Sequence, residues 1–153
     1  MSRYREYLDI LKKEAIKEGF AVRLSVDEVS YISWQEGSLN IPKEIGIEKI
    51  LDTESKVYFF LHEMGHHNLR KDWNSFTETF PTLSYAEEQD ILFRVTKYLR
   101  RISYKVSLLN EEYKAWDEGF LLAGKLGIEV NMEKWVKIRD KSLMAYIKYY
   151  SNK

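Results

Sequence analysis

The chain has 153 residues, of which 44 % are hydrophobic and 31 % are charged. These values are ordinary for a soluble globular domain and exclude a fibrous or disordered chain. The 24 Lys and Arg residues balance the 24 Asp and Glu residues, and cysteine is absent. The charge balance predicts neither a nucleic-acid nor a membrane partner, and disulfides, thiolate ligands and thiol nucleophiles are excluded.

The chain also lacks the sequence features of export and membrane insertion. Charged residues interrupt every apolar stretch of the N-terminus, which no secretory signal tolerates. No segment approaches the roughly 20 apolar residues of a membrane span. We therefore expect a cytoplasmic protein with a single domain over residues 1–153.

The first third of the chain predicts one helix followed by a small sheet. Apolar residues recur every three or four positions over residues 2–18, and Gly19 follows where helices often end. Alternation and β-branched residues then predict strands. The predicted strands are residues 20–26, 29–34 and 39–41. Asp27 and Glu28 are expected to turn a hairpin between the first two, and Pro42 is expected to end the third. Residues 45–51 are expected to form a short helix or a loop.

The rest of the chain predicts further helices. Asp52 can cap the first of them, and Asn131 can begin the last. The predicted helices are residues 53–70, 84–126 and 131–150. A 43-residue helix would be about 65 Å long, too long for a small domain, so we expect a break near Ser107 or Asn110. Residues 73–81 are expected to form a loop that rims the functional site.

The most informative segment is His62-Glu63-Met64-Gly65-His66, a His-Glu-x-x-His motif inside the predicted helix 53–70. Residues four apart share one helix face, so both imidazoles can bind one ion, at about 2.0–2.1 Å for zinc. Glu63 then lies beside the ion without binding it. From there its carboxylate can take a proton from a zinc-bound water and pass it to a leaving amine.

The motif, and the order of helix, small sheet, metal-binding helix and further helices, resemble the catalytic core of the zincin metallopeptidases. The resemblance implies an α+β fold in which a three-stranded twisted sheet packs on the metal-binding helix and several α-helices follow. In the family, the edge strand before that helix binds extended substrate by strand addition, which here would involve residues 37–41. A bare core of this length resembles the minigluzincins and the ImmA/IrrE-like peptidases, some of which cut one regulatory protein.

A catalytic zinc normally has three protein ligands, and two zincin patterns offer a third. The metzincin pattern would use Asp72, but Leu69 stands where that pattern has a sharply turning glycine. The gluzincin pattern, Glu-x-x-Ala, matches Glu112 and Ala115. We therefore favour Glu112 over Asp72. The minor alternatives are Glu111, Asp117 and Glu118.

Residues around the metal are harder to assign. Trp116 stands where some gluzincins have an Asp that orients a zinc-bound imidazole, so another acceptor is required. The acceptors considered are a main-chain carbonyl, Asp90 and Asp117. Tyr113 and Tyr146 are considered as donors to the oxyanion. His67 is turned about 100° from His66, so we expect it on the helix surface or behind the metal ligands.

The sequence thus predicts a zinc-dependent metallopeptidase that acts on a peptide or protein. The zinc ion would be held by His62, His66 and Glu112, and Glu63 would activate the water. The alternative is a non-catalytic zincin-fold module that binds proteins and keeps a vestigial or structural metal site. The presence of Glu63 favours the enzyme, because a structural site needs no base.

Overall fold

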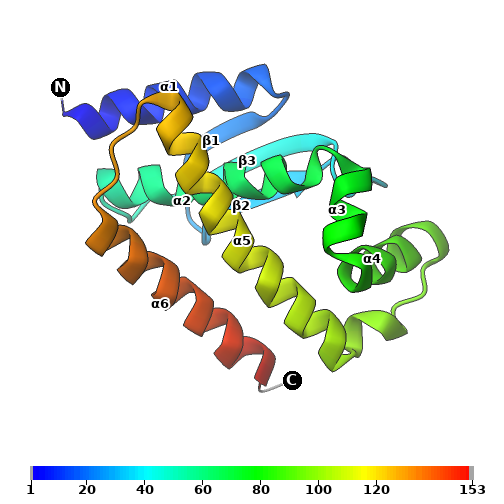
Figure 1. Ribbon diagram of the computed structural model, residues 1–153. Helices are drawn as coiled ribbons and strands as arrows, with labels where there is room; N and C mark the ends of the chain where they lie inside the picture. The colour runs from blue at the N-terminus through cyan, green and yellow to red at the C-terminus, as the bar shows by residue number, and fades with distance from the viewer. Residues whose placement is uncertain (1, 152–153) are drawn as a thin grey trace.

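The computed structural model describes residues 2–151, which form an α+β fold of six α-helices, a 3-10 helix and a three-stranded sheet (Figure 1). The α-helices are α1 (Arg3–Lys17), α2 (Thr53–Arg70), α3 (Trp73–Thr79), α4 (Pro81–Phe93), α5 (Ile102–Leu126) and α6 (Met132–Ser151). The strands are β1 (Ala21–Val26), β2 (Tyr31–Trp34) and β3 (Pro42–Glu48), and the 3-10 helix is η1 (Lys97–Arg100). Among these helices, none combines the length and the apolar character needed to cross a membrane.

The sheet confirms the predicted three strands but not their connection. Its order is β1-β3-β2, with β3 parallel to β1 and antiparallel to β2. The predicted hairpin between β1 and β2 is therefore wrong, because β3 lies between them. Ile45 of β3 stands opposite Val22 on one side and Ile32 on the other. This pairing joins residues far apart in the sequence, which a local turn signal cannot reveal.

The predicted third strand is displaced along the chain. Pro42 opens β3 instead of ending a strand, a position at which proline costs no ladder hydrogen bond. Residues 45–47 are all buried, because a central strand is covered on both faces. Without an alternating pattern, these residues were expected to be a short helix or loop, and that expectation is wrong.

Three helices match their predicted bounds to within one residue: α1, α2 and α6. The caps explain why α2 begins where it does. The Asp52 carboxylate accepts a hydrogen bond from the backbone N–H of Ser55 at 2.8 Å, and this satisfies a donor that the first turn leaves free. Local signals of this kind are readable from sequence alone.

The region between α2 and α5 differs from prediction. Residues 73–79 form α3 instead of a loop, and Pro81 begins α4. The predicted break near Ser107 or Asn110 occurs earlier, where Arg94 adopts the left-handed conformation (φ 55°) and ends α4. Helix α5 is then continuous from Ile102 to Leu126.

Helix α2 is the centre of the fold. The main apolar core joins side chains of α1, β3, α2, α5 and α6, and Figure 1 shows α5 crossing α2. A Cβ atom on Gly65 would lie 1.9 Å from the carbonyl oxygen of Ala115, and one on Gly119 would lie 2.6 Å from that of Leu61. The two helix backbones are therefore in direct contact where they cross.

We expect Gly65→Ala to lower the free energy of unfolding by about 3 kcal/mol, because the new methyl group must push α5 away from α2. Gly124→Ala on α5 is the matched control, since nothing lies within 4 Å of its Cβ position. It should raise stability by about 0.5–1 kcal/mol. Urea unfolding of both variants measures the difference. Equal stability of the two variants would contradict the backbone contact.

Candidate metal centre

Five ionisable side chains meet where α2 crosses α5. Those of α2 are His62, His66 and Arg70, and those of α5 are Glu111 and Glu112. All five are buried. The three residues of α2 stand four apart and therefore share one face of the helix. The crossing turns this face toward the two carboxylates.

The predicted ligands lie within contact distance of one another. His62 Nε2 is 3.0 Å from one carboxylate oxygen of Glu112, and His66 Nε2 is 3.2 Å from the other. Two atoms bound tetrahedrally at 2.0–2.1 Å to one zinc ion lie about 3.3–3.4 Å apart. Two imidazoles and one carboxylate are also a common ligand set of catalytic zinc. The donor types are thus those of catalytic zinc sites, and each imidazole lies within 3.2 Å of a Glu112 oxygen.

Glu63 lies beside this group. One of its carboxylate oxygens is within 4.8 Å of the imidazole nitrogens of His62 and His66. The Glu112 oxygens are closer, which favours Glu112 as the third ligand and leaves Glu63 as a neighbour. Burial raises the pKa of Glu63 to about 8. A carboxyl group with this proton affinity suits a general base that works near neutral pH.

The carboxylate of Glu111 contacts the ring nitrogen of His66 that does not face Glu112. Its Oε2 is 2.9 Å from His66 Nδ1, and its Oε1 accepts hydrogen bonds from Nε of Arg70 at 2.9 Å and from a second guanidinium nitrogen. Arg70 also donates to Glu87 of α4 and to the carbonyl oxygen of Leu39, each at 3.1 Å. Burial alone would raise the pKa of the Glu111 carboxyl, but the charges of His66 and Arg70 lower it. A carboxylate-histidine pair of this kind orients a ligand imidazole.

From the sequence, Glu111 was expected only as a minor ligand alternative, and Asp90 and Asp117 were the candidates for orienting an imidazole. Within residues 2–151, neither aspartate has a hydrogen bond to His62 or His66, and Asp117 is exposed. A usable signal was present in the sequence. An arginine four residues after His66 on the same helix face needs a carboxylate when it is buried. Of the adjacent pair, Glu111 can pair with Arg70 while Glu112 is left to bind a metal ion.

His62 is held differently from His66. Its ring stacks on the indole of Trp116, with centroids 4.2 Å apart and planes 17° apart. His62 Nδ1 and Trp116 Nε1 are buried and have no hydrogen-bond partner among the described residues. Burial lowers the pKa of His62. One imidazole is therefore oriented by a carboxylate and the other by the face of a tryptophan.

The other residues considered from sequence lie elsewhere. Asp72 caps α3, where its carboxylate accepts hydrogen bonds from Ser75 N at 3.2 Å and Ser75 Oγ at 3.0 Å. The carboxylate of Asp72 is engaged in this cap, which favours Glu112 over Asp72 as the third ligand. His67 lies outside the ligand group, as expected. It is buried in the core, with its ring 5.1 Å from that of Phe20, and is not on the helix surface.

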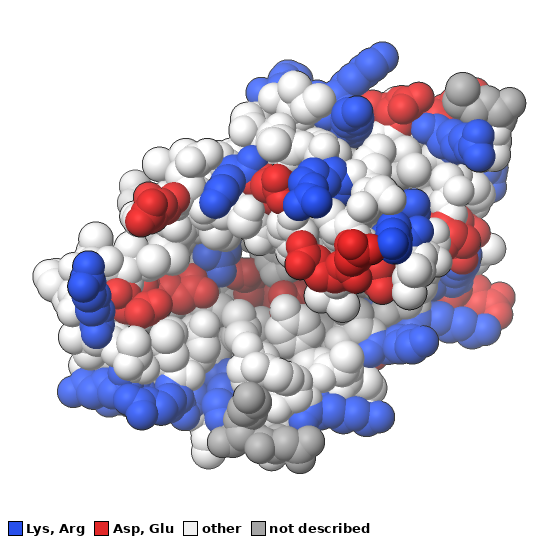
Figure 2. Space-filling view, turned by 180° about the vertical axis from the view of Figure 1, so that it is seen from behind, with Lys and Arg blue, Asp and Glu red and all other residues white. Residues whose placement is uncertain are grey.

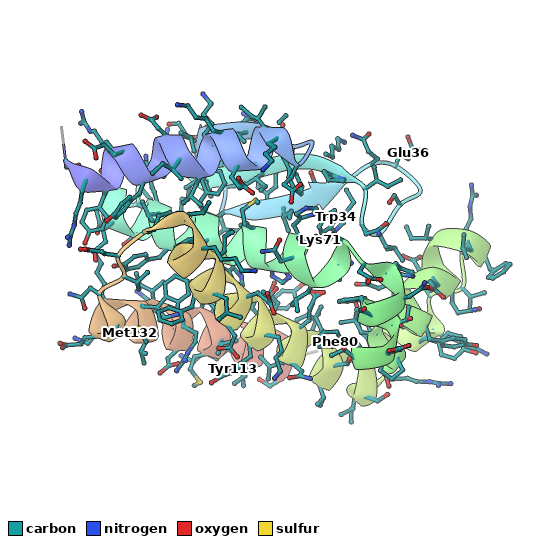
Figure 3. The ribbon with its side chains drawn as sticks, turned by 45° about the horizontal axis from the view of Figure 1, so that its top comes forward. Trp34, Glu36, Lys71, Phe80, Tyr113 and Met132 are labelled. Carbon is teal, nitrogen blue, oxygen red and sulfur yellow. The ribbon has the colours of Figure 1, made fainter. Side chains whose placement is uncertain are left out.

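Of the two tyrosines considered for the oxyanion, Tyr146 reaches the site. It lies on α6, and burial together with the negative charge of Glu112 raises the pKa of its phenol. Tyr113 is 41 % exposed, and the guanidinium of Arg139 lies 5.1 Å from its ring centroid. Figure 3 shows Tyr113 at the outer side of the helical layer.

A cleft of about 920 Å³ opens over the ligand group. One wall is β2, the other is α6, and the floor includes His62, Glu63, His66 and Glu112. Figure 2 shows a recess in one face of the molecule with acidic side chains in its floor. The expected substrate strand at residues 37–41 is wrong, because these residues form a loop. The edge strand at the cleft is β2, and Figure 3 shows its last residue, Trp34, beside the end of α2.

Compared with protein-family models, with curated proteins and with solved structures, the chain matches none. The functional argument therefore rests on the residues of this site and their geometry.

We expect Glu111→Gln to weaken zinc binding by about 10- to 100-fold, because the charged acceptor of the His66 Nδ1–H is lost. Asp117→Asn is the matched control, since it makes the same isosteric change at an exposed position of α5. Competition with a chelating dye measures both zinc dissociation constants. Unchanged affinity in a folded Glu111→Gln protein would contradict the orienting part given to Glu111.

Proposed function

We propose that this protein is a zinc-dependent metallopeptidase of the gluzincin type. The observation that carries the proposal is the convergence of two imidazole nitrogens and one carboxylate, with contacts of 3.0 and 3.2 Å, in the floor of an open cleft. His62, His66 and Glu112 hold the metal in this proposal. Glu63 is the general base, and peptide hydrolysis is the reaction.

Each residue of the site has a distinct part in the reaction. When bound, zinc supplies Lewis acidity to the substrate carbonyl and to the attacking water. The Glu63 carboxylate accepts a proton from that water and returns it to the leaving amine. The phenol of Tyr146 is protonated at neutral pH, as any tyrosine is, and burial together with the charge of Glu112 raises its pKa further. It can therefore donate a hydrogen bond to the carbonyl oxygen as negative charge develops there.

The cleft supports an extended peptide as the substrate. Strand β2 pairs with β3 on one side only, so its other edge has free backbone donors and acceptors along the cleft wall. A peptide can add to this edge as a further strand, which places its backbone across the cleft. Aromatic and aliphatic side chains of α6 line the opposite wall. Those that line it are Ile138, Ala145, Tyr146, Tyr149 and Tyr150.

Metal content tests the ligand set. Wild-type protein should hold about one zinc ion per chain. Glu112→Ala should lose it, because only two ligands remain, whereas Asp72→Ala should keep it, since Asp72 caps α3. Elemental analysis of protein dialysed against zinc and then against metal-free buffer gives the ratio. Loss of zinc in Asp72→Ala alone would move the third ligand to the metzincin position.

Removal of the base tests catalysis separately from metal binding. Glu63→Gln should keep its zinc but lose about 10²- to 10⁴-fold in rate, because the amide cannot accept the proton. Mass spectrometry of a peptide-library digest compares its products with those of wild type. Cleavage at the wild-type rate by the Glu63→Gln protein would refute the mechanism. A wild-type protein that holds zinc but cleaves nothing in the library would support the non-catalytic module instead.

A further inference from the structure

A second feature lies at the turn from α4 through η1 into α5, outside the metal centre. Residues 94–105 contain five basic residues and no acidic residue, although the whole chain has no net charge. The five are Arg94, Lys97, Arg100, Arg101 and Lys105. We call this turn, with the apolar residues that flank it, the α4–α5 corner. Figure 1 shows it at the periphery of the molecule, away from α1.

The cations of the α4–α5 corner form no ion pair within the described chain. Within residues 2–151, no carboxylate oxygen lies within 4.0 Å of any of the five. Elsewhere among the described residues, exposed cations such as Arg3 and Lys49 have such a partner and others such as Lys12 do not, so what distinguishes the corner is the density of five cations within residues 94–105. The positive field of the corner is therefore not neutralised within the described part of the chain, and an anionic partner can satisfy it.

Large apolar side chains flank these cations on both sides in the sequence. Leu92 and Phe93 at the end of α4 are 65 % and 66 % exposed, and Ile102 and Val106 at the start of α5 are 78 % and 62 % exposed. A single exposed apolar residue needs no explanation, but four beside one cationic segment do. Apolar side chains next to unpaired cations are the composition of surfaces that bind at the membrane interface.

The α4–α5 corner packs on a buried apolar cluster of the folded domain. Behind it, Phe76, Phe80 and Leu83 form a second buried cluster, against which Leu108 of α5 also packs. The left-handed backbone of Arg94 fixes the turn at the end of α4. The exposed side chains are thus presented by packed helices and not by a free tail. Figure 2 shows Lys and Arg side chains gathered along the lower edge of this end of the molecule.

The aromatic residues of the corner favour a lipid surface over a single-stranded nucleic acid. Nucleic-acid binding of that kind uses open aromatic faces on which bases stack. Here the ring of Tyr98 contacts that of Tyr85, with centroids 5.0 Å apart, and the cations of Lys97 and Arg101 lie 5.2 and 4.4 Å from its centroid. Its faces are therefore engaged within the protein. Phe93 is exposed, but the other three flanking apolar side chains, Leu92, Ile102 and Val106, are aliphatic. Aliphatic side chains have no part in base stacking, but they fit the acyl boundary of a bilayer.

We propose that the α4–α5 corner binds the surface of membranes that contain anionic lipids. The cations contact the headgroups, and the flanking apolar side chains enter the boundary with the acyl chains. This is peripheral binding, which needs no membrane-spanning helix. None of the five cations lines the cleft over the metal centre, so the inference does not depend on the proposed peptidase activity. It replaces the expectation, drawn from the overall charge balance, that the protein has no membrane partner.

Co-sedimentation with vesicles tests the proposal on the full chain. The probes are vesicles of phosphatidylcholine alone and of phosphatidylcholine with phosphatidylserine. The wild-type protein should bind the anionic vesicles at least about tenfold more tightly, and added salt should weaken the binding. Equal binding to both kinds of vesicle, or none to either, would overturn the proposal.

Two variants separate the charged and apolar parts of the corner. The triple variant Lys97→Gln, Arg100→Gln, Arg101→Gln should bind the anionic vesicles about 100-fold more weakly, since each cation near an anionic surface contributes about fivefold. The double variant Phe93→Ser, Ile102→Ser should weaken binding by at least about tenfold, because less apolar surface is buried. Retained binding in both variants would place the lipid site elsewhere.

A matched control has the same charge change on other surfaces. Lys12→Gln, Lys13→Gln, Lys125→Gln alters exposed residues that have no ion pair within 4.0 Å in the described chain. It should bind anionic vesicles within about twofold of wild type, and an equal loss would indicate a non-specific charge effect. Far-UV circular dichroism and zinc content verify folding in every variant. Binding of a single-stranded oligonucleotide at concentrations where the vesicles are not bound would assign the corner to nucleic acid and overturn the proposal.

Discussion

The direct backbone contact between α2 and α5 is the constraint on which both the core and the metal centre depend. Gly65 touches Ala115, and these residues are sequence neighbours of the proposed ligands: His66 follows Gly65, and Glu112 stands one helical turn before Ala115. A side chain at position 65 would therefore do more than disturb packing. It would move the carboxylate of Glu112 away from the imidazoles that it now contacts at 3.0 and 3.2 Å.

The close crossing of α2 and α5 also brings several ionisable side chains together in the protein interior. Glu63, Glu111 and Glu112 lie near one another, and Arg70 is the only permanently charged cation among their ion-pair partners in the described chain. Burial lowers the pKa of His66, but the two neighbouring carboxylates outweigh this and raise it well above its ordinary value. Unpaired charge in a protein interior is costly, and here the protonated His66 and Arg70 together offset the carboxylates of Glu111 and Glu112. A divalent cation held by the same side chains would take the place of the imidazole proton, which is consistent with the proposed metal site.

The sequence predicted the parts of the structure that depend on local signals. Helix α2 was located by its period and by the Asp52 cap, and the spacing of the motif together with Glu112 predicted three side chains that the structure brings close together. The sheet order was not predictable in this way, since β3 enters between two strands that are neighbours in the sequence. Nor was the contact of Glu111 with His66 and Arg70, because it depends on the rotation of α5 relative to α2, which the two glycine contacts set.

Trp116 connects the metal centre to the helix that covers it. Its indole stacks on His62 on one side and meets the ring of Trp135, on α6, with centroids 5.1 Å apart. Helix α6 also carries Tyr146, whose phenol lies in the field of Glu112. The orientation of His62 and the position of Tyr146 are thus both set by the same aromatic packing. Where a carboxylate would hold the imidazole by a single hydrogen bond, the tryptophan holds it by surface contact. The orientation of the His62 ring therefore depends on how α6 packs against α5, and the same packing determines how Tyr146 is placed in the cleft.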